Sequence, residues 1–368
     1  MGKRMKLYIP GPIEVGEDVL EALSQPMMPH FGDDWSKEHF ETIDLLKKVF
    51  KTNGEIYVIP GSGSAALDMG IGNLIYGDKS ALVLSNGFFG ARLAEIANGF
   101  CANVDTIDFG FANPFDVEIV KKKLKENHYD VLLTTHVETS VGIRNPIKEL
   151  ASLTKDSETI FFVDGVSSIG VEDIDLDSWG VDVCVTASQK GMESPPGLGI
   201  IAFNKKAWKL MESVNRPDWY LNFKIWKKYE EYWGPSHPQL VTQAIPIFRG
   251  MKAALKRIVD NGYEKHLNDY KEITKYFRDS LENLGYELYI KNGYSHGLTS
   301  VVIPDQRANE VMSYFKDNYQ ILIGGGLGDS KGKVVRVGHM GPFASKKDLD
   351  PIINIFKEIK QELFGAGS

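Results

Sequence analysis

The sequence has 368 residues, of which 42 are Lys or Arg and 49 are Asp or Glu, giving a formal net charge of −7. That length suits two domains with dry cores, and the acidic balance argues against a nucleic-acid partner. Two cysteines, neither in a CxxC or Cys/His cluster, support neither a disulfide framework nor a metal site. Glycine is abundant, at 36 residues against a usual share of about 7%. This indicates that the backbone turns sharply or approaches a ligand closely at several points.

The first residues lack a targeting pattern. The chain begins Met1-Gly-Lys-Arg4, and Pro10, Gly11 and Pro12 interrupt the apolar stretch that a signal peptide needs. No run approaches the roughly 20 apolar residues that cross a bilayer. We therefore expect a cytoplasmic protein without a membrane partner.

Short apolar runs alternate with amphipathic stretches in the first half of the chain. The runs predicted as strands are Glu55–Ile59, Ala81–Ser85, Asn103–Asp108, Val131–Thr135, Thr159–Asp164, Val181–Thr186 and Gly199–Phe203. The helices predicted between them are Ala65–Ile75, Arg92–Ala97, Asp116–Lys125 and Ile147–Thr154. Several strands are apolar without alternation, as expected where helices cover both faces of a sheet. The sequence therefore predicts an α/β fold with a mostly parallel, doubly wound sheet.

From about Gln243 the pattern changes to long helices, one running through Arg257 and one spanning Tyr263–Leu284. The elements predicted after them are strands near Thr299–Ile303 and Val334–Val337 and helices near Asn309–Asp317 and Leu349–Leu363. We interpret this region as a second, smaller domain of the α+β type. We predict a large domain over residues 15–255 and a small domain that consists of residues 256–368 together with residues 1–14.

A glycine-rich turn follows the first predicted long strand and reads Pro60-Gly-Ser-Gly-Ser-Ala-Ala66. Free backbone N–H groups and serine hydroxyls at a helix N-terminus bind anions such as phosphate. Dinucleotide-binding proteins share this spacing, but they carry an acidic residue about 20 positions on, at the end of the second strand. Here that strand ends in Ser85 and Asn86. The turn therefore fits the phosphate of another ligand better than that of a nicotinamide cofactor. A tight turn without a bound ligand is the remaining alternative.

Two charged residues follow strongly apolar strands. Asp164 closes one of them, at the sheet edge where open α/β proteins bind ligands; a cap or turn aspartate is the alternative. Lys190 precedes a rigid turn that contains Gly191, Pro195 and Pro196. A lysine desolvated there has a lowered affinity for its proton and forms imines, whereas an ordinary solvated lysine is the alternative.

A phosphate turn, a carboxylate for a pyridinium nitrogen and an imine-forming lysine are together what pyridoxal phosphate chemistry needs. Further motifs occur in order: Gly11-Pro12, Asn86-Gly-Phe-Phe-Gly90, His136-Val-Glu-Thr-Ser-Val-Gly142, Val163-Asp-Gly-Val-Ser-Ser168, Ser188-Gln-Lys-Gly191 and Arg336-Val-Gly-His-Met-Gly341. With them the sequence resembles the class V, fold-type I aminotransferases, in particular the alanine–glyoxylate and serine–pyruvate group. The resemblance covers nearly the whole chain.

The resemblance implies pyridoxal 5'-phosphate as the cofactor and a role for each matching residue. Lys190 would form the imine with the cofactor and later move the proton, and Asp164 would keep the pyridinium nitrogen protonated. The other residues implied around the phosphate and the ring are Ser62, Gly63, Ser64, Phe89, Thr139, Val166 and Gln189. Arg336 would bind the substrate carboxylate through a bidentate contact, and Gly11 would lie on the substrate side.

The family also shares its active sites across a dimer interface, which implies a homodimer here. Ser236 stands where relatives have a threonine that reaches the partner's phosphate, and it keeps the hydroxyl. Two departures concern the cofactor face and the substrate side. Phe89 replaces the more usual Trp or Tyr, and the segment 30–35 replaces a His-Arg pair expected near the active-site entrance.

The leading functional prediction is transamination, in which alanine or serine gives its amino group to a 2-oxo acid such as glyoxylate or pyruvate. An aminophosphonate or ureido-type transaminase stays open, as does a desulfurase- or kynureninase-like lyase. A desulfurase needs a loop cysteine that reaches the substrate, whereas Cys101 and Cys184 are predicted to be small core residues. A nicotinamide-dependent oxidoreductase and a non-catalytic cofactor-binding regulator are the more distant alternatives.

Overall fold

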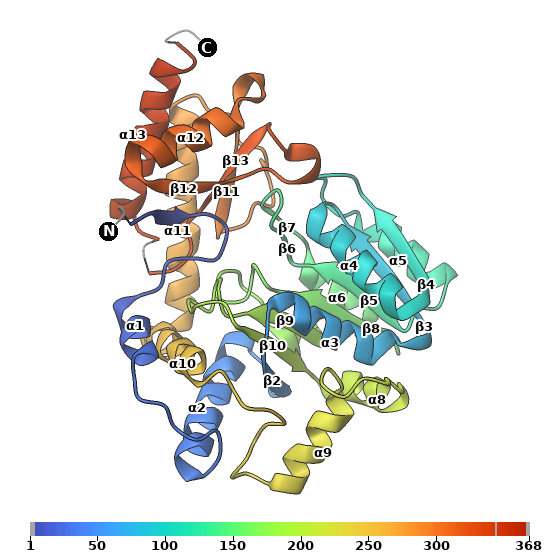
Figure 1. Ribbon diagram of the computed structural model, residues 1–368. Coiled ribbons are helices and arrows are strands. Elements are labelled where there is room, and N and C mark those ends of the chain that lie inside the picture. Colours follow the sequence, from blue (N-terminus) through green and yellow to red (C-terminus); the bar gives the residue numbers. More distant parts are fainter. Residues whose placement is uncertain (1–3, 343, 366–368) are drawn as a thin grey trace.

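The computed structural model describes residues 4–342 and 344–365. Its largest sheet has seven strands in the order β2-β10-β9-β8-β5-β3-β4 (Figure 1). The strands are β2 (Glu55–Pro60), β3 (Gly77–Ser85), β4 (Cys101–Asp108), β5 (Val131–Thr135), β8 (Ile160–Asp164), β9 (Val183–Ala187) and β10 (Leu198–Phe203). Strand β10 runs antiparallel to both of its neighbours, whereas the pairs from β9 to β4 are parallel. The predicted mostly parallel α/β sheet is confirmed.

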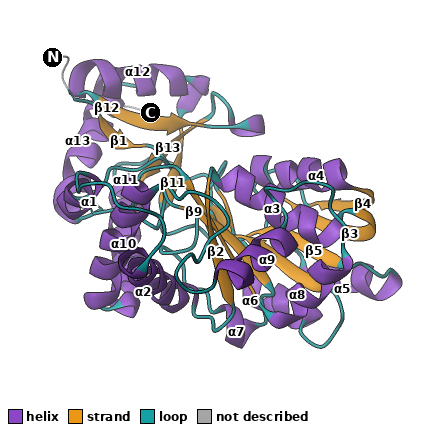
Figure 2. Cartoon of the chain, turned by 60° about the horizontal axis from the view of Figure 1, so that its bottom comes forward, coloured by secondary structure: helices purple, strands orange, loops and turns teal. Residues whose placement is uncertain are grey.

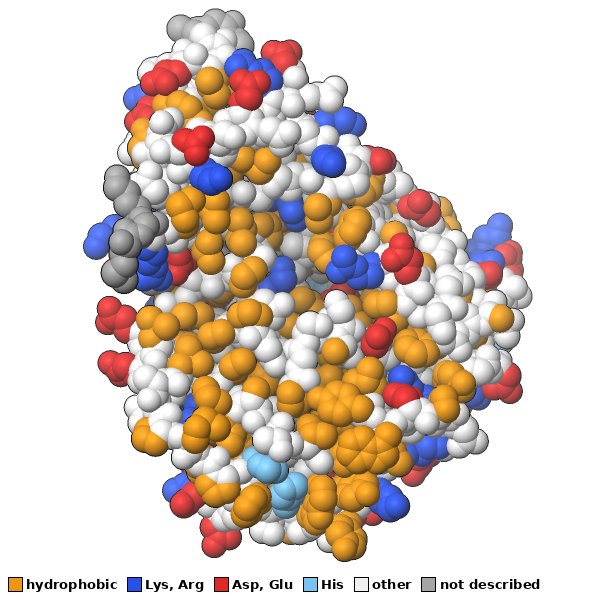
Figure 3. Space-filling view, viewed as in Figure 1, with side chains coloured by type: hydrophobic (Ala, Val, Ile, Leu, Met, Phe, Trp, Pro, Cys, Tyr) orange, Lys and Arg blue, Asp and Glu red, His pale blue; other side chains and the backbone are white. Residues whose placement is uncertain are grey.

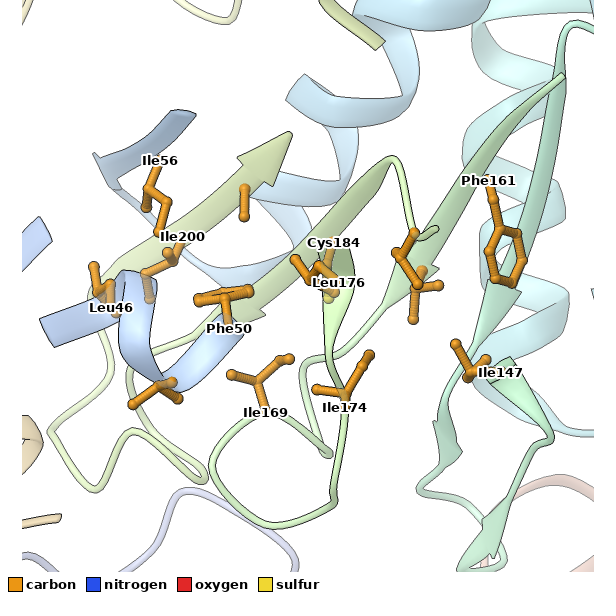
Figure 4. Packing of buried hydrophobic residues seen from close by; sticks show 14 of the residues in the cluster. Leu46, Phe50, Ile56, Ile147, Phe161, Ile169, Ile174, Leu176, Cys184 and Ile200 are labelled. Carbon is orange, nitrogen blue, oxygen red and sulfur yellow. The ribbon is translucent and has the colours of Figure 1, made fainter. Parts of the chain in front are cut away.

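Both faces of this sheet are buried. Phe161 and Ile200 point into one hydrophobic cluster, part of which is drawn in Figure 4. Their next neighbours along the strands, Phe162 and Ile201, point into a second cluster on the other face. Since successive residues of a strand face opposite sides, a strand covered twice is apolar at every position, which explains the continuous apolar runs.

Helices supply the two covering layers, and Figure 2 shows the sheet between them. The first cluster takes side chains from α2 (Asp33–Phe50), α5 (Val117–Glu126), α6 (Ile147–Thr154), α7 (Leu176–Trp179) and α10 (Ile245–Asp260). The second takes side chains from α3 (Gly63–Ile75), α4 (Phe88–Phe100), α8 (Lys205–Ser213) and α9 (Phe223–Trp233). The short helix α1 (Glu17–Leu23) lies against α10.

A second, four-stranded sheet lies in the upper part of Figure 1, in the order β1-β12-β13-β11. Its strands are β1 (Lys6–Tyr8), β11 (Leu298–Val302), β12 (Ile321–Gly325) and β13 (Val334–Gly338). The helices that pack on it are α11 (Tyr263–Asn283), α12 (Ala308–Tyr319) and α13 (Lys346–Glu362). In β1, Lys6 pairs with Ile321 of β12, so an early strand completes a sheet made of C-terminal strands.

Smaller elements complete the structure. Strands β6 (Val137–Glu138) and β7 (Ile143–Arg144) form a short antiparallel pair, and two 3₁₀ turns span Pro304–Gln306 and Gly328–Ser330. Both cysteines are buried. Among the described residues, no helix is long and apolar enough to cross a membrane.

Candidate active site

Most of the predicted site residues meet at the carboxyl ends of the large sheet's strands. Asp164 ends β8, Lys190 follows β9, and the turn with Ser62 follows β2. They share a cavity of about 150 Å³. Its lining residues are Ser62, Gly63, Ser64, Leu67, Phe89, Arg92, Val137, Thr139, Asp164, Val166, Ser167, Gln189 and Lys190. Figure 3 shows the molecule hollowed between the parts built on its small and large sheets.

The glycine-rich turn forms the N-terminus of α3. Ser62 is the N-cap residue, and its hydroxyl accepts a hydrogen bond from the backbone N–H of Ala65 at 3.2 Å. A Cβ added at Gly63 would lie 3.0 Å from the Cβ of Ala187 and 3.3 Å from a methyl group of Val166, so only glycine fits there without a shift. The turn therefore presents backbone N–H groups and the positive end of the helix dipole, which suit a phosphate.

Asp164 is buried with an incompletely satisfied carboxylate. Within the described residues, its side chain accepts one hydrogen bond, from the backbone N–H of Val166 at 2.9 Å. Burial, and to a smaller extent the charge of Glu138, raise the pKa of Asp164 to about 6. An oxygen that faces the cavity without a donor suits the protonated nitrogen of a bound pyridine ring.

The amine of Lys190 lies beneath the chain that follows β1. Its Nζ donates a hydrogen bond to the carbonyl oxygen of Pro10 at 2.6 Å, and a Cβ added at Gly11 would lie 3.0 Å from Nζ. Gly11 also has a φ of +132°, which favours glycine. Burial, followed by the charge of Arg336, lowers the pKa of Lys190 to about 8. The amine is therefore far easier to deprotonate than a solvated lysine.

Phe89 lies in the first turn of α4 and is held by a residue that the sequence analysis missed. The buried carboxylate of Glu138 accepts hydrogen bonds from the backbone N–H groups of Phe89 at 3.0 Å and Gly90 at 2.8 Å. Its other oxygen accepts from the backbone N–H and the hydroxyl of Ser140. Glu138 thus fixes the start of α4, and with it the backbone that carries the Phe89 ring.

The remaining predicted cofactor residues complete the wall. The hydroxyls of Thr139 and Ser167 are hydrogen-bonded at 2.5 Å, and Val166 lies beside the turn at Gly63. The side-chain oxygen of Gln189 is buried and has no hydrogen-bond partner within the described residues. A buried amide oxygen without a partner at the cavity wall suits a hydrogen-bond donor on a bound group.

Arg336 lies on β13, outside the lining residues of the cavity. Its Nε donates to the carbonyl of Gly325 and its Nη1 to the carbonyl of Thr139, both at 2.7 Å. Burial lowers the pKa of Arg336 to about 10. Within the described residues Nη2 donates no hydrogen bond, so a fixed guanidinium keeps one nitrogen open for a carboxylate.

Ser236 is not brought into the cavity of its own chain. Its carbonyl accepts a hydrogen bond from the backbone N–H of Gly32 at 2.7 Å, at the start of α2. The segment 30–35 is also outside the cavity lining, because it packs against residues near Ser236. Trp35 is buried and donates to the side chain of Gln239 at 2.9 Å, and the carbonyl of His30 accepts from the same amide at 2.7 Å.

Comparison with known proteins identifies the family, because residues 19–350 match the model of the class-V aminotransferases. The chain belongs to this family. It is 31% identical to alanine–glyoxylate aminotransferase 1 of Saccharomyces cerevisiae over 97% of both chains. It is 28% identical to the L-aspartate–glyoxylate aminotransferase of Paracoccus denitrificans, over 96% of this chain and 90% of that one. The crystal structure of alanine–glyoxylate aminotransferase from Nostoc matches with a TM-score of 0.92 at 28% identity, covering 98% of this chain and 96% of that one.

The protein is accordingly a pyridoxal-phosphate-dependent transaminase, as its sequence motifs predicted. Three observations fit the cofactor: the open N-terminus of α3, the carboxylate of Asp164 with its single hydrogen bond, and the amide oxygen of Gln189, which has no partner in the described part of the chain. When bound, the cofactor supplies an electron-withdrawing ring that takes up the charge left on the α-carbon of the substrate.

Proposed function

We propose that this transaminase takes its amino group from alanine or serine and passes it to glyoxylate or pyruvate. The observation that carries the proposal is a buried amine close to a fixed guanidinium, because an amino-acid substrate presents one group to each. Lys190 is near enough to Arg336 for the guanidinium charge to lower the pKa of the lysine. The yeast and Nostoc relatives are named for alanine and glyoxylate, which favours this pair.

The preference for a small donor rests on the chain that covers Lys190. The carbonyl of Pro10 lies 2.6 Å from Nζ, and a Cβ added at Gly11 would crowd the lysine, at 3.0 Å from the same nitrogen. The backbone of Ile13 is also tied to this turn, since its N–H donates to the carbonyl of Gln189 at 3.3 Å. Backbone this close to the amine favours a substrate with a short side chain.

The proposed roles follow from where each group lies. Lys190 takes the proton from the α-carbon and returns it, because an amine with a pKa of about 8 serves as both base and acid near neutral pH. Asp164 accepts the hydrogen bond of the ring nitrogen, and Arg336 holds the substrate carboxylate in one orientation. The side chains proposed to hold the cofactor are Ser62, Gly63, Ser64, Phe89, Thr139, Val166 and Gln189, with Gly11 on the substrate side.

We also propose a homodimer in which Ser236 gives its hydroxyl to the phosphate bound by the partner subunit. Exposed rings near Ser236 support this: Tyr232 is 78% exposed and Phe31 is 53% exposed. In Figure 3, hydrophobic side chains gather on the lower part of the face that also carries the hollow. Apolar surface of this kind is more typical of an interface than of a monomer surface.

Two further proposals complete the assignment. We propose a large domain over residues 15–255 and a small domain over residues 256–368 with residues 1–14, which the pairing of β1 with β12 supports. We propose the cytoplasm as the site of action, since two buried free cysteines suit a reducing compartment.

A half-reaction panel tests the substrate proposal. The protein loaded with pyridoxal phosphate is mixed with alanine, serine, aspartate, an aminophosphonate or a ureido donor, without a 2-oxo acid. Alanine and serine should remove the visible absorbance of the Lys190 imine. If both fail while aspartate, the phosphonate or the ureido compound succeeds, the proposed donor is wrong. Lys190→Ala, which cannot form the imine or be trapped by borohydride, serves as the control.

A further inference from the structure

Arg92 lines the cavity but belongs to none of the roles assigned above. It lies on α4, one turn beyond Phe89, and is half-buried. Its guanidinium carbon lies 5.0 Å from the ring centroid of Phe88 and 5.0 Å from that of Phe89. Two aromatic contacts therefore orient the guanidinium at the cavity wall, without satisfying any of its five N–H donors.

The other arginines show how unusual this is. The chain has nine arginines, and eight donate hydrogen bonds within the described residues. These are Arg4, Arg144, Arg216, Arg249, Arg257, Arg278, Arg307 and Arg336. The guanidinium of Arg92 alone donates no hydrogen bond and pairs with no carboxylate in residues 4–342 and 344–365. An anionic ligand in the cavity would satisfy these donors with charge-assisted hydrogen bonds.

The charges around the cavity indicate which anion this is. Among the lining residues, Arg92 and Lys190 are cations and Asp164 is an anion. Lys190 would bind the aldehyde carbon of the cofactor, and Asp164 would face its ring nitrogen. A phosphate monoester carries about 1.5 to 2 negative charges near neutral pH, and the turn at Ser62 meets it only with neutral dipoles. Arg92 is the charged side chain of the cavity that is left to balance this phosphate.

We propose that Arg92 is a further binding residue for the cofactor phosphate, completing with its guanidinium the shell that begins at the N-terminus of α3. Helices α3 and α4 lie side by side and both begin at the same edge of the sheet (Figure 1). Long side chains on a helix point back toward its N-terminus, so Arg92 extends toward the edge where the turn of Ser62 lies. Leu67 of α3 and Arg92 of α4 line the same cavity between these helices.

The test compares two aldehydes that differ only in the phosphate. The protein is freed of cofactor, and its affinities for pyridoxal 5'-phosphate and for pyridoxal are measured from the absorbance of the imine. Arg92→Gln should weaken binding of pyridoxal phosphate by about ten- to a hundredfold and leave binding of pyridoxal unchanged. Arg92→Lys should recover part of the loss, because it keeps the charge but not the fork.

Arg307→Gln is the matched control, because it removes one positive charge at α12, outside the cavity lining. It should bind both aldehydes like the unaltered protein, and urea unfolding of the cofactor-free variants reports whether they are folded. Equal losses for both aldehydes with Arg92→Gln would overturn the proposal in favour of an effect through the Phe89 ring. Unchanged binding of pyridoxal phosphate by Arg92→Gln would also overturn the proposal. This holds even if the variant changes the KM for a dicarboxylic donor or the dimer equilibrium, because Arg92 would then act elsewhere than on the phosphate. This measurement uses no amino donor, so the proposal on Arg92 and the proposal of alanine or serine as the donor can fail independently.

Discussion

Replacing Glu138 by Gln tests how the fold holds Phe89 in the cofactor site. The side chain of Glu138 is fully buried, and its two oxygens accept four hydrogen bonds. Oε2 accepts from the backbone N–H groups of Phe89 at 3.0 Å and Gly90 at 2.8 Å, and Oε1 accepts from Ser140, at 3.0 Å from the backbone N–H and 2.6 Å from the hydroxyl. Glutamine keeps the size of the side chain but places an NH₂ group, which cannot accept, at one of the two positions.

The expected loss follows from the better of the two amide orientations. If the NH₂ group faces α4, two N–H groups lose their acceptor. If it faces Ser140, the hydroxyl loses its acceptor but turns to accept from the amide, so one hydrogen bond replaces another. The net loss is then the hydrogen bond of the backbone N–H of Ser140. One hydrogen bond to a charged group contributes about 1.5–3 kcal/mol, and a charge at a helix N-terminus about 0.3–1 kcal/mol. We therefore expect Glu138→Gln to lower the free energy of unfolding by about 2–4 kcal/mol.

Urea unfolding of the cofactor-free protein, followed by circular dichroism, measures this loss. Glu126→Gln is the control, because its carboxylate is 58% exposed and, among residues 4–342 and 344–365, forms an ion pair with Lys122 alone. It should leave the unfolding midpoint unchanged. Affinity for pyridoxal phosphate should also fall in Glu138→Gln, since the first turn of α4 carries Phe89. A loss below about 0.5 kcal/mol, the usual effect of a surface substitution, would refute the reasoning, as would an unchanged cofactor affinity.

Three further predictions concern the charged residues of the site. The rate at which the cofactor-free protein forms an imine with pyridoxal phosphate should rise up to about pH 8 and then level off. The reason is that burial and the charge of Arg336 lower the pKa of Lys190 to about 8. A stopped-flow rate that still rises past about pH 10 would contradict this prediction. Asp164→Asn should stabilise the cofactor-free protein near pH 7.5 by roughly 3 kcal/mol, because burial raises the carboxyl pKa from 3.8 to about 6 at about 1.4 kcal/mol per unit. A raised carboxyl pKa lowers the stability of the folded protein only as the pH rises from 3.8 through about 6. The stability gained by Asp164→Asn should therefore disappear when urea unfolding is repeated near pH 4. A gain that persists near pH 4 would exclude the buried charge of Asp164 as its cause. Arg336→Lys should raise the KM for the amino donor about tenfold or more, with a smaller effect on kcat. The reason is that a compact ammonium lacks the planar fork whose separate nitrogens contact the carbonyls of Gly325 and Thr139 and face a carboxylate. An unchanged KM would remove Arg336 from the substrate site.

The large sheet is the part of the fold that the sequence predicts best. A strand such as Ile160–Asp164 is apolar at each of its first four positions because helices cover both faces, and this pattern is local. Strands β1 and β12 were not predicted. Strand β1 has three residues and pairs with a strand far along the chain, and β12 ends in Gly324 and Gly325, which usually weaken a strand. Their partners, rather than their own residues, make them strands.

Some residues of the candidate site can likewise be predicted from their local sequence, whereas others depend on distant parts of the chain. Asp164, Lys190 and the turn at Ser62 stand at positions that strand order and turn chemistry make noticeable. Glu138 does not, since its role depends on backbone N–H groups 48 and 49 positions away. No pattern around Arg92 marks it either, because the absence of a partner for its guanidinium becomes visible only after every other side chain is placed.

The pairing of β1 with β12 also sets the order in which the site is assembled. Lys6 leaves the ribosome 315 positions before Ile321, its partner in the sheet, and β1 pairs with no other strand of the described chain. The carbonyl of Pro10, which covers the amine of Lys190, comes two residues after the end of β1. We therefore expect a nascent chain that stops short of β12 to hold this cover over Lys190 less firmly than the full chain does. We expect the amine of Lys190 to acquire its final surroundings late in synthesis, after residues 62–190, which include the cavity lining, have been made.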